Sequence, residues 1–292
     1  MKEQFNKGLL LTSLGSFWWG FIGVLYFEYV SFIGHIELVV HRCLWTAVML
    51  IITTTFLAKW NTFLIIITNK KNLLFLFFSG LLIFINWAVW IYAVATERII
   101  DASFGYFIMP IISVLLGYIF FGEKLNKKRF FSIFLVLISI FILIFFNLKS
   151  LPWVGLIVAF SWAFYNLLRK KIQVDTDVGL LIESLYILPF AIFTFYLITQ
   201  KGLNNFNMSN PGLSIFLMLA GPMTVIPLFL YVRGVELIGL GPTGMIFYIT
   251  PTLQFILGYF YYNEEFSIVK FVSFIIIWIA VIIYLKDLYE TN

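Results

Sequence analysis

The chain carries little charge for its length. Only 11% of its 292 residues are Asp, Glu, Lys or Arg, whereas soluble domains typically carry about 25%. Hydrophobic residues make up 62% of the sequence, so the charged surface that a soluble domain needs cannot be built. The net charge of +5 is small and scattered, which argues against nucleic acid as a partner. The composition therefore predicts a protein that lies in a lipid bilayer.

Several motifs that would indicate catalysis are missing. Cys43 is the single cysteine, so the chain can form no internal disulfide and no cysteine metal site. No P-loop or dinucleotide glycine motif is present, which argues against ATP-driven transport by this chain. The histidines His35 and His41 form no HExxH pattern, and no serine lies in a GxSxG turn. The sequence thus favours a protein that is not an enzyme, with no cofactor and no metal.

Hydrophobic runs fill most of the sequence. A helix needs roughly 20 apolar residues to cross about 30 Å of hydrocarbon, and lipid offers no partner for open backbone groups. The first run follows Lys2 and Lys7 as in a signal peptide, but no small-residue cleavage site follows, so we expect it to be retained. The ten predicted spans are residues 8–28, 36–58, 72–95, 101–121, 129–147, 151–168, 179–198, 212–235, 243–262 and 267–285.

The basic residues predict the orientation of these spans. With the N-terminus in the cytoplasm, the cytoplasmic side holds Lys2, Lys7, Lys59, Lys70, Lys71, Lys124, Lys127, Lys128, Arg129, Arg169, Lys170, Lys171, Arg233 and Lys286. The outer side holds only Arg98, Lys149, Lys201 and Lys270, and Arg42 lies within a span. Basic residues favour the cytoplasmic side, so we predict a multi-pass protein of the cell membrane with both termini cytoplasmic. The basic loop residues are interpreted as topology determinants near anionic lipid.

The fourth and ninth spans resemble each other at a constant offset of 141 positions. Pro110 corresponds to Pro251, Leu116-Gly117-Tyr118 to Leu257-Gly258-Tyr259, and Glu123 to Glu264. Gly80 and Gly221 share this offset. Each half, 1–147 and 148–292, then has five spans, an odd number, so the second half must enter the membrane from the opposite face. This predicts an all-α membrane protein of two inverted five-helix repeats, an architecture that places substrate near the midplane between the halves.

The two matched prolines are predicted to lie in the middle of their helices. A proline there removes a backbone hydrogen bond and frees a carbonyl. One interpretation is a simple packing kink; the other, which we favour, is that Pro110 and Pro251 kink helices that line a central cavity. Tyr106 and Tyr248 precede the prolines closely, so the kinks should expose them.

Ionisable residues within the spans are the main candidates for a substrate or coupling site, because they are expensive in lipid. Glu37 and His41 are four residues apart and share one helical face, and Glu183 occupies the matching place in the seventh span. Arg42 is predicted to pair with Glu37 or with an anionic substrate group. Alternatively, the glutamates favour the helix dipole and His41 is a hydrogen-bonded core histidine. Glu37 or His41 could also carry a coupling proton.

Aromatic and amide side chains complete the candidate site. Trp87, Tyr106, Tyr248 and Gln254 are predicted to contact substrate, because aromatic faces can hold a cationic or planar solute. For any single aromatic residue, lipid contact or packing is the commoner role. Further candidates of the same kind are Trp19, Asn86, Tyr92 and Tyr165. Asp101 and Pro242 are predicted to lie at the starts of the fourth and ninth helices.

Taken in order along the chain, these residues resemble the RarD branch of the EamA-type drug/metabolite transporter superfamily. The matching stretches include Glu37 with His41-Arg42, Asn86-Trp87, Ala102 to Phe107, Leu168-Arg169-Lys170 and Tyr248-Ile249 with Pro251 to Phe255. The resemblance covers essentially the whole chain and implies ten helices, cytoplasmic termini, and export or exchange of small metabolites. Met109 and Phe247 depart from it, since Asn and Gln are expected there, which makes the substrate unsafe to carry over.

The function that these observations predict is secondary-active transport of a small metabolite or drug-like solute by alternating access. A non-transporting membrane sensor or scaffold is the main alternative, and a membrane-embedded enzyme is a further one. The duplication argues against a scaffold, which has no need of two-fold alternation. The expected partners are the lipid bilayer and a small-molecule substrate, and the sequence leaves the oligomeric state open between a monomer and a homodimer.

Overall fold

The computed structural model describes residues 2–95, 99–147, 153–172, 174–261 and 268–291, and all the regular structure in these ranges is helical. In chain order the helices are α1 (Lys2–Phe17), the π-helix η1 (Trp18–Ile22), α2 (Gly23–Tyr29), α3 (His35–Phe56), α4 (Trp60–Thr68), α5 (Lys70–Ala95), α6 (Ile99–Phe121), α7 (Lys127–Asn147), α8 (Trp153–Lys171), α9 (Thr176–Gln200), α10 (Pro211–Met218), α11 (Ala220–Ile238), α12 (Leu240–Ile246), α13 (Ile249–Phe260) and α14 (Ile268–Thr291).

Seven helical segments of the described chain are long and apolar enough to cross a membrane. They cover Glu3–Tyr29, His35–Phe56, Lys70–Ala93, Lys127–Phe146, Thr176–Gln200, Pro211–Ile238 and Ile268–Thr291. Each corresponds to a span predicted from the sequence. The remaining predicted spans coincide with α6, whose part Gly105–Phe121 is a shorter apolar helix, with α8, which ends in three basic residues, and with the pair α12–α13.

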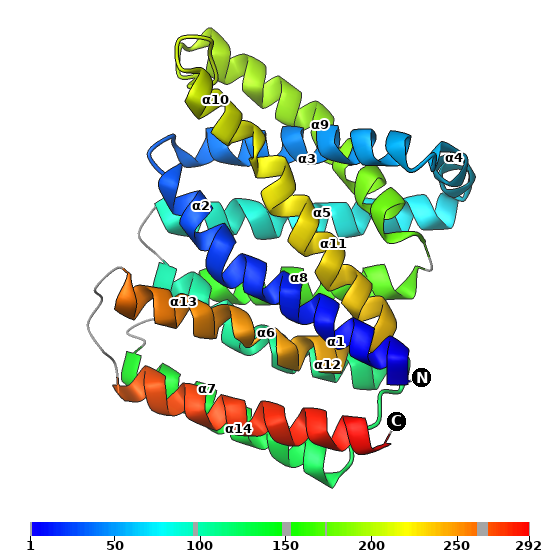
Figure 1. Cartoon of the computed structure of the whole chain (residues 1–292), viewed down its shortest axis with the longest axis vertical. Helices are drawn as coiled ribbons and strands as arrows, with labels where there is room; N and C mark the ends of the chain where they lie inside the picture. Colours follow the sequence, from blue (N-terminus) through cyan, green and yellow to red (C-terminus); the bar gives the residue numbers. More distant parts are fainter. Residues whose placement is uncertain (1, 96–98, 148–152, 173, 262–267, 292) are drawn as a thin grey trace.

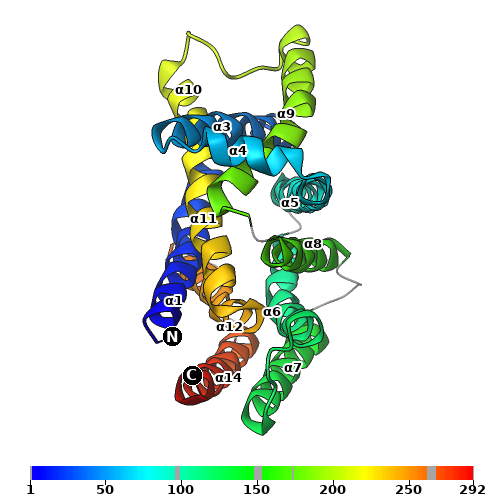
Figure 2. The same cartoon turned by 90° about the vertical axis from the view of Figure 1, so that its right-hand side faces the viewer.

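The helices form two facing layers that are joined at both ends of the long axis. Figure 2 shows α11, α1 and α14 on one side and α5, α8 and α7 on the other. Between and within the layers, α1 packs on α11, α5 on α8, α3 on α9, α6 on α12 and α7 on α14. Both chain ends lie at the same side of the bundle, at the right of Figure 1.

The first membrane segment contains a π-helical turn at its centre. Residues Trp18 to Ile22 form η1 between α1 and α2, and Gly20 lies in this turn. A side chain at Gly20 would overlap the carbonyl of Thr250 in α13, so the glycine lets the two helices approach closely. Because π-turns are common at functional sites, this local irregularity marks the region for closer inspection.

The ninth predicted span is irregular just before Pro251. Regular α-helical hydrogen bonding is interrupted at Phe247 and Tyr248, whose backbone stays right-handed helical, and Pro251 lies in the first turn of α13, where its missing N–H costs no hydrogen bond. Pro251 has no N–H to donate to the carbonyl of Phe247. That carbonyl instead accepts a hydrogen bond from the backbone N–H of Thr250 at 2.9 Å. The Phe247 carbonyl is therefore not free, contrary to the expectation for Pro251. Pro110, by contrast, lies inside the uninterrupted helix α6.

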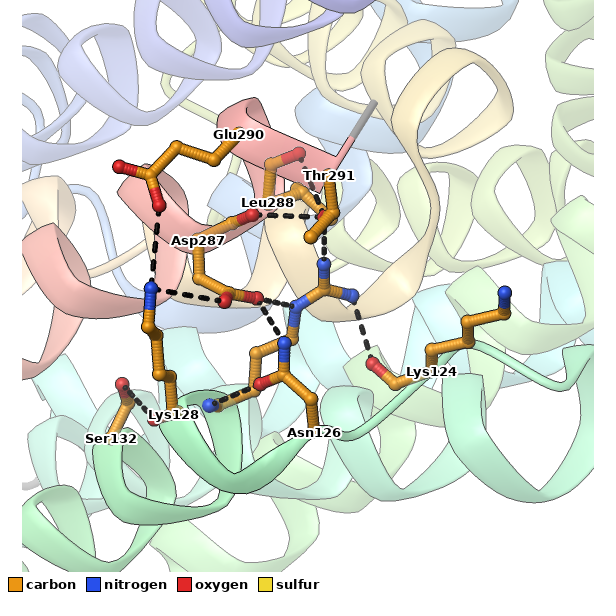
Figure 3. Close-up of polar contacts among 9 residues, drawn as sticks. Lys124, Asn126, Lys128, Ser132, Asp287, Leu288, Glu290 and Thr291 are labelled. Carbon is orange, nitrogen blue, oxygen red and sulfur yellow. Dashed lines mark hydrogen bonds and ion pairs between the residues drawn. The ribbon is translucent and has the colours of Figure 1, made fainter.

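A buried ion pair ties α7 to α14 at the end of the bundle (Figure 3). The Nε of Arg129 donates to Asp287 at 2.8 Å, and both side chains are under 10% exposed. Asn126 also donates to this carboxylate at 2.6 Å, while Lys128 reaches Glu290 at 3.3 Å on the surface. Arg129 thus has a structural role inside the protein, which its interpretation as a topology determinant near anionic lipid did not include.

Removing one charge of this buried pair should cost far more than removing one of the surface pair. Asp287→Asn leaves the buried Arg129 guanidinium without a counter-charge, which should cost about 3–5 kcal/mol. Glu290→Gln disrupts only the exposed contact with Lys128, which should cost less than about 1 kcal/mol. Thermal unfolding of the purified variants in one detergent measures both. Equal apparent Tm values for the two variants would contradict this assignment.

Candidate functional site

A cavity of about 560 Å³, part of it open to solvent, lies between the helices of the two halves. Its walls come from η1, α2, α3, α5, α6, α8 and the α12–α13 segment. Most of its lining side chains are aromatic, and none of the described ones is a carboxylate. The lining residues are Trp19, Gly23, Phe27, Arg42, Asn86, Trp87, Trp90, Tyr106, Trp162, Phe247, Thr250 and Gln254.

The structure brings four of the residues predicted for the substrate site into this cavity. They are Arg42, Trp87, Tyr106 and Gln254. Trp19 and Asn86, which the sequence marks as further candidates, line it as well. Asn86 is held in place by its amide, which donates to the Val158 carbonyl at 3.0 Å and to the Ser161 hydroxyl at 3.1 Å, both on α8.

Trp162 and Phe247 form much of the aromatic wall, and sequence reasoning misses both as site residues. The rings of Trp19 and Trp162 meet edge to face with centroids 5.0 Å apart, and Phe247 contacts Tyr106 at 5.6 Å. The repeat offset of 141 applied to Tyr106 leads to Phe247, so that signal was present in the sequence. Of the two departures from the family, Phe247 lines the cavity, whereas Met109 is fully buried and accepts a hydrogen bond from Ser113.

Arg42 is the charged group of this cavity. Its guanidinium carbon lies 5.0 Å from the ring centroid of Phe27 and 4.6 Å from that of Trp87, and its Nε donates to the Thr224 hydroxyl at 3.0 Å. The contact with two ring faces offsets part of the cost of burying the cation. Within the described part of the chain, no ion pair joins Arg42 to Glu37 or to any other carboxylate. The predicted pairing with Glu37 is therefore wrong.

Glu37 and His41 lie together outside the cavity. The Nε2 of His41 is 3.5 Å from the Glu37 carboxylate, as expected for residues that share a helical face. That carboxylate also accepts from the backbone N–H and the side-chain amide of Asn205, each at 2.7 Å, and so fixes the loop before α10. The Nδ1 of His41 accepts from Trp45 at 3.2 Å, which leaves the proton of a neutral imidazole on the nitrogen that faces Glu37.

Glu183 lies in a second buried polar cluster. Its carboxylate accepts from Ser79 at 2.5 Å and from Tyr165 at 3.2 Å, and it lies 3.5 Å from Arg169. It also borders a smaller pocket. Trp87 lines both this pocket and the larger cavity.

Tyr248 and the two prolines do not line the cavity. The ring of Tyr248 is fully buried outside the cavity that Phe247 lines, and its hydroxyl donates to the Phe107 carbonyl at 2.8 Å. Pro110 and Pro251 are buried too, and the residue four positions before each, Tyr106 or Phe247, is the one that reaches the cavity.

Ion pairs and hydrogen bonds, here called ties, join the helices at the end of the bundle where the chain termini lie. Glu123 accepts from Lys170 at 2.9 Å and from the backbone N–H groups of Leu240 and Gly241 at the start of α12. Arg169 and Lys170 therefore contact carboxylates inside the protein and do not serve only as topology determinants. Glu264 and the side chain of Asp101 lie outside the described residues.

Lys59 adds another tie at this end. It pairs with Asp177 at 2.8 Å and with Asp175 at 3.3 Å. Partial burial disfavours the ammonium form of Lys59, but the two carboxylates outweigh it and raise the pKa of Lys59 above its usual value. The tie between α3 and α9 is therefore kept at neutral pH.

Comparison with known proteins agrees with this description. Residues 6–145 and 150–286 each match the EamA-like transporter family. Protein RarD of Escherichia coli is 31% identical over 99% of this chain and 97% of its own length, and the uncharacterized transporter YojE of Bacillus subtilis is 33% identical over 96% and 93%. One solved crystal structure shares the fold with a TM-score of 0.72 at 12% identity, covering 97% of this chain and 98% of its own.

The apolar helices, the cavity between them and these matches define a multi-pass membrane protein of a transporter family. The chain belongs to the EamA-like transporter family. Within that family its near-full-length similarity to RarD proteins places it in the RarD branch.

Cysteine labelling should distinguish the cavity wall from the buried contact beside it. In a Cys43→Ser background, Gln254→Cys should react rapidly with a water-soluble maleimide in detergent, because residue 254 faces the cavity. Tyr248→Cys should react many times more slowly, since a buried thiol forms little thiolate and meets no reagent. Mass spectrometry of the labelled protein gives both rates. Faster labelling at 248 than at 254 would refute the placement of the cavity.

Proposed function

We propose that the chain is a secondary transporter that moves a small metabolite or drug-like solute across the cell membrane by alternating access. Ten membrane spans, arranged as two inverted five-helix repeats over 1–147 and 148–292, would surround one central site. The observation that carries the proposal is the aromatic cavity whose walls come from both halves of the chain. A family of transporters is also what the relatives indicate.

The pattern of helix packing supports the two-fold repeat. In the proposed repeat, α1 is equivalent to α8 and α5 is equivalent to α11. The pair α1–α11 is therefore equivalent to the pair α8–α5, and the helices of both pairs pack together. The pairs α3–α9, α6–α12 and α7–α14 are each made of equivalent helices, and these also pack together. Such self-paired helices are expected to lie on a two-fold axis.

Contacts between equivalent residues give this axis a position. The Tyr248 hydroxyl donates to the carbonyl of Phe107, and the two residues are separated by the repeat offset of 141. The same offset relates Tyr106 and Phe247, whose rings touch beside the cavity. A residue can contact its own equivalent only close to a two-fold axis, so the axis would pass between α6 and the α12–α13 segment, next to the proposed substrate site.

The position of the cavity supports alternating access. Its lining residues lie toward the ends of α2 and α5 and the beginnings of α3 and α6, which is the side of the bundle away from the chain termini. On the side of the termini, the ties of Glu123, Lys59 and Glu183 hold the two halves together. With both termini cytoplasmic, the structure would represent a state closed to the cytoplasm. Transport would require these ties to break.

Residues in and near the cavity have proposed roles in this cycle. Arg42, Trp87, Tyr106 and Gln254 would contact the substrate directly, since they line the cavity. Glu183 would couple substrate binding to opening, because Trp87 lines both the cavity and the smaller pocket that Glu183 borders. Glu37 and His41 would act at the outer side by holding or releasing the loop of Asn205, and could carry a coupling proton.

Cross-linking the proposed cytoplasmic tie should stop transport. In a Cys43→Ser background, Glu123→Cys with Lys170→Cys replaces the ion pair in which the Lys170 Nζ and the Glu123 Oε1 are 2.9 Å apart with two thiols. A short bifunctional thiol reagent should then lock this end and abolish flux of a panel of labelled organic acids, amino acids and amines in proteoliposomes. A reductant that cleaves the link should restore it.

The matched control is Lys128→Cys with Glu290→Cys, which joins α7 and α14 across a comparable ion pair away from the cavity. This cross-link should leave flux unchanged. Continued flux through the first cross-linked protein, or no flux of any panel member before cross-linking, would contradict the proposed function.

Membrane orientation is tested separately. Met208, which is 94% exposed, lies in the loop before α10, and Thr68 lies at the exposed end of α4. In the Cys43→Ser background, Met208→Cys should be labelled in intact cells by an impermeant thiol reagent, whereas Thr68→Cys should require permeabilised cells. The reverse pattern would place the chain ends outside and invert the proposed access states.

A further inference from the structure

The cation of Arg42 has no counter-charge in the cavity. Arginine stays protonated in proteins, so the guanidinium brings a full positive charge into an apolar space. The nearby carboxylates are engaged elsewhere: Glu37 with Asn205 and His41, and Glu183 with Ser79, Tyr165 and Arg169. None of the described lining residues carries a negative charge. An isolated charge at this depth is expensive and is normally paired.

The geometry of Arg42 leaves its best donors free. Its Nε donates to Thr224, and its guanidinium carbon lies over the rings of Phe27 and Trp87. Within the described residues, the two terminal nitrogens have no hydrogen-bond acceptor. These nitrogens form the planar edge that binds a carboxylate with two parallel hydrogen bonds. The side chain is thus held rigidly by its neighbours while its anion-binding edge is unoccupied by protein groups.

The rest of the cavity wall is suited to a flat apolar body. Trp19 and Trp162 meet edge to face, and Tyr106 and Phe247 lie beside them. Aromatic rings pack favourably against another ring in offset or edge-to-face geometry. Thr250 and Gln254 are polar lining residues contributed by the second half of the chain.

From these observations we propose that the cavity binds an organic anion, a carboxylate attached to a planar aromatic body. The carboxylate lies on the terminal nitrogens of Arg42, and the ring packs among the tryptophans and Tyr106. This assignment rests on the proposed transport function and names its substrate class. It disfavours cationic solutes, because Arg42 repels them and no lining carboxylate would bind them. The contacts with Phe27 and Trp87 then position Arg42, which would otherwise swing toward the outer surface.

A matched series of probes tests the charge preference. We use 2-naphthoate, 2-naphthamide and 2-naphthylmethylamine, which share one ring system and differ in charge, with the full-length protein in lipid nanodiscs. Isothermal titration calorimetry at neutral pH should show naphthoate binding about 10-fold to 100-fold more tightly than naphthamide, as expected for a charge-assisted bidentate hydrogen bond. The amine should bind most weakly.

Variants of Arg42 assign the preference to this side chain. Arg42→Gln should abolish the advantage of naphthoate over naphthamide, whereas Arg42→Lys should keep a reduced advantage, because an ammonium retains the charge but not the planar edge. Arg233→Gln removes one positive charge from a half-exposed arginine paired with Glu236 away from the cavity, and should leave all affinities unchanged. If Arg42→Gln fails to fold, the wild-type series and Arg42→Lys still show whether Arg42 confers the preference for naphthoate.

The outcomes separate this inference from the transport proposal. Three results would overturn the anion site. They are equal affinities of naphthoate and naphthamide for the wild-type protein, tighter binding of the amine, and an anion preference that persists in Arg42→Gln. Counterflow of naphthoate in proteoliposomes then tests movement. Binding through Arg42 without counterflow would overturn transport of this class of solute and leave the anion site standing.

Discussion

The structure depends on one constraint: a charge that leaves water for the interior of a helical membrane protein must find its partner within the protein. Arg129 forms an ion pair with Asp287, Arg169 with Glu183, and Asp177 with Lys59. Glu37 accepts hydrogen bonds from Asn205 and lies beside His41. Arg42 differs among the described buried charges, because its neighbours are two aromatic rings and a hydroxyl. The unpaired charge therefore coincides with the large cavity.

The ties differ in how strongly they resist separation, and this difference matches their places in the fold. Arg129 and Asp287 are almost fully buried, so breaking that pair would leave a charge stranded. Lys170 and Glu123 are 19% and 18% exposed, so water can replace each partner when they separate. The pair between α7 and α14 suits a permanent joint. The tie at the start of α12 suits a contact that forms and breaks in a transport cycle.

Much of the architecture could be predicted from hydropathy and from the register of the repeat. Each of the seven described membrane segments overlaps a predicted span, because roughly twenty apolar residues with polar flanks leave little choice in lipid. The interruption at Phe247 and Tyr248 could not be predicted in the same way. Whether Pro251 kinks a helix or begins a new one depends on whether another donor, here the Thr250 N–H, reaches the Phe247 carbonyl.

The sequence by itself determined that the chain is helical and membrane-embedded, and that its fourth and ninth spans are related at an offset of 141, since these follow from composition and periodicity. It also supplied Arg42, Trp87, Tyr106 and Gln254 as candidates. Only the tertiary structure decided that Arg42 faces the cavity while Glu37 and His41 face the loop of Asn205. Neighbouring residues point about 100° apart on a helix, and the rotation of α3 about its axis is set by its packing against α9 and α11, which hydropathy does not encode.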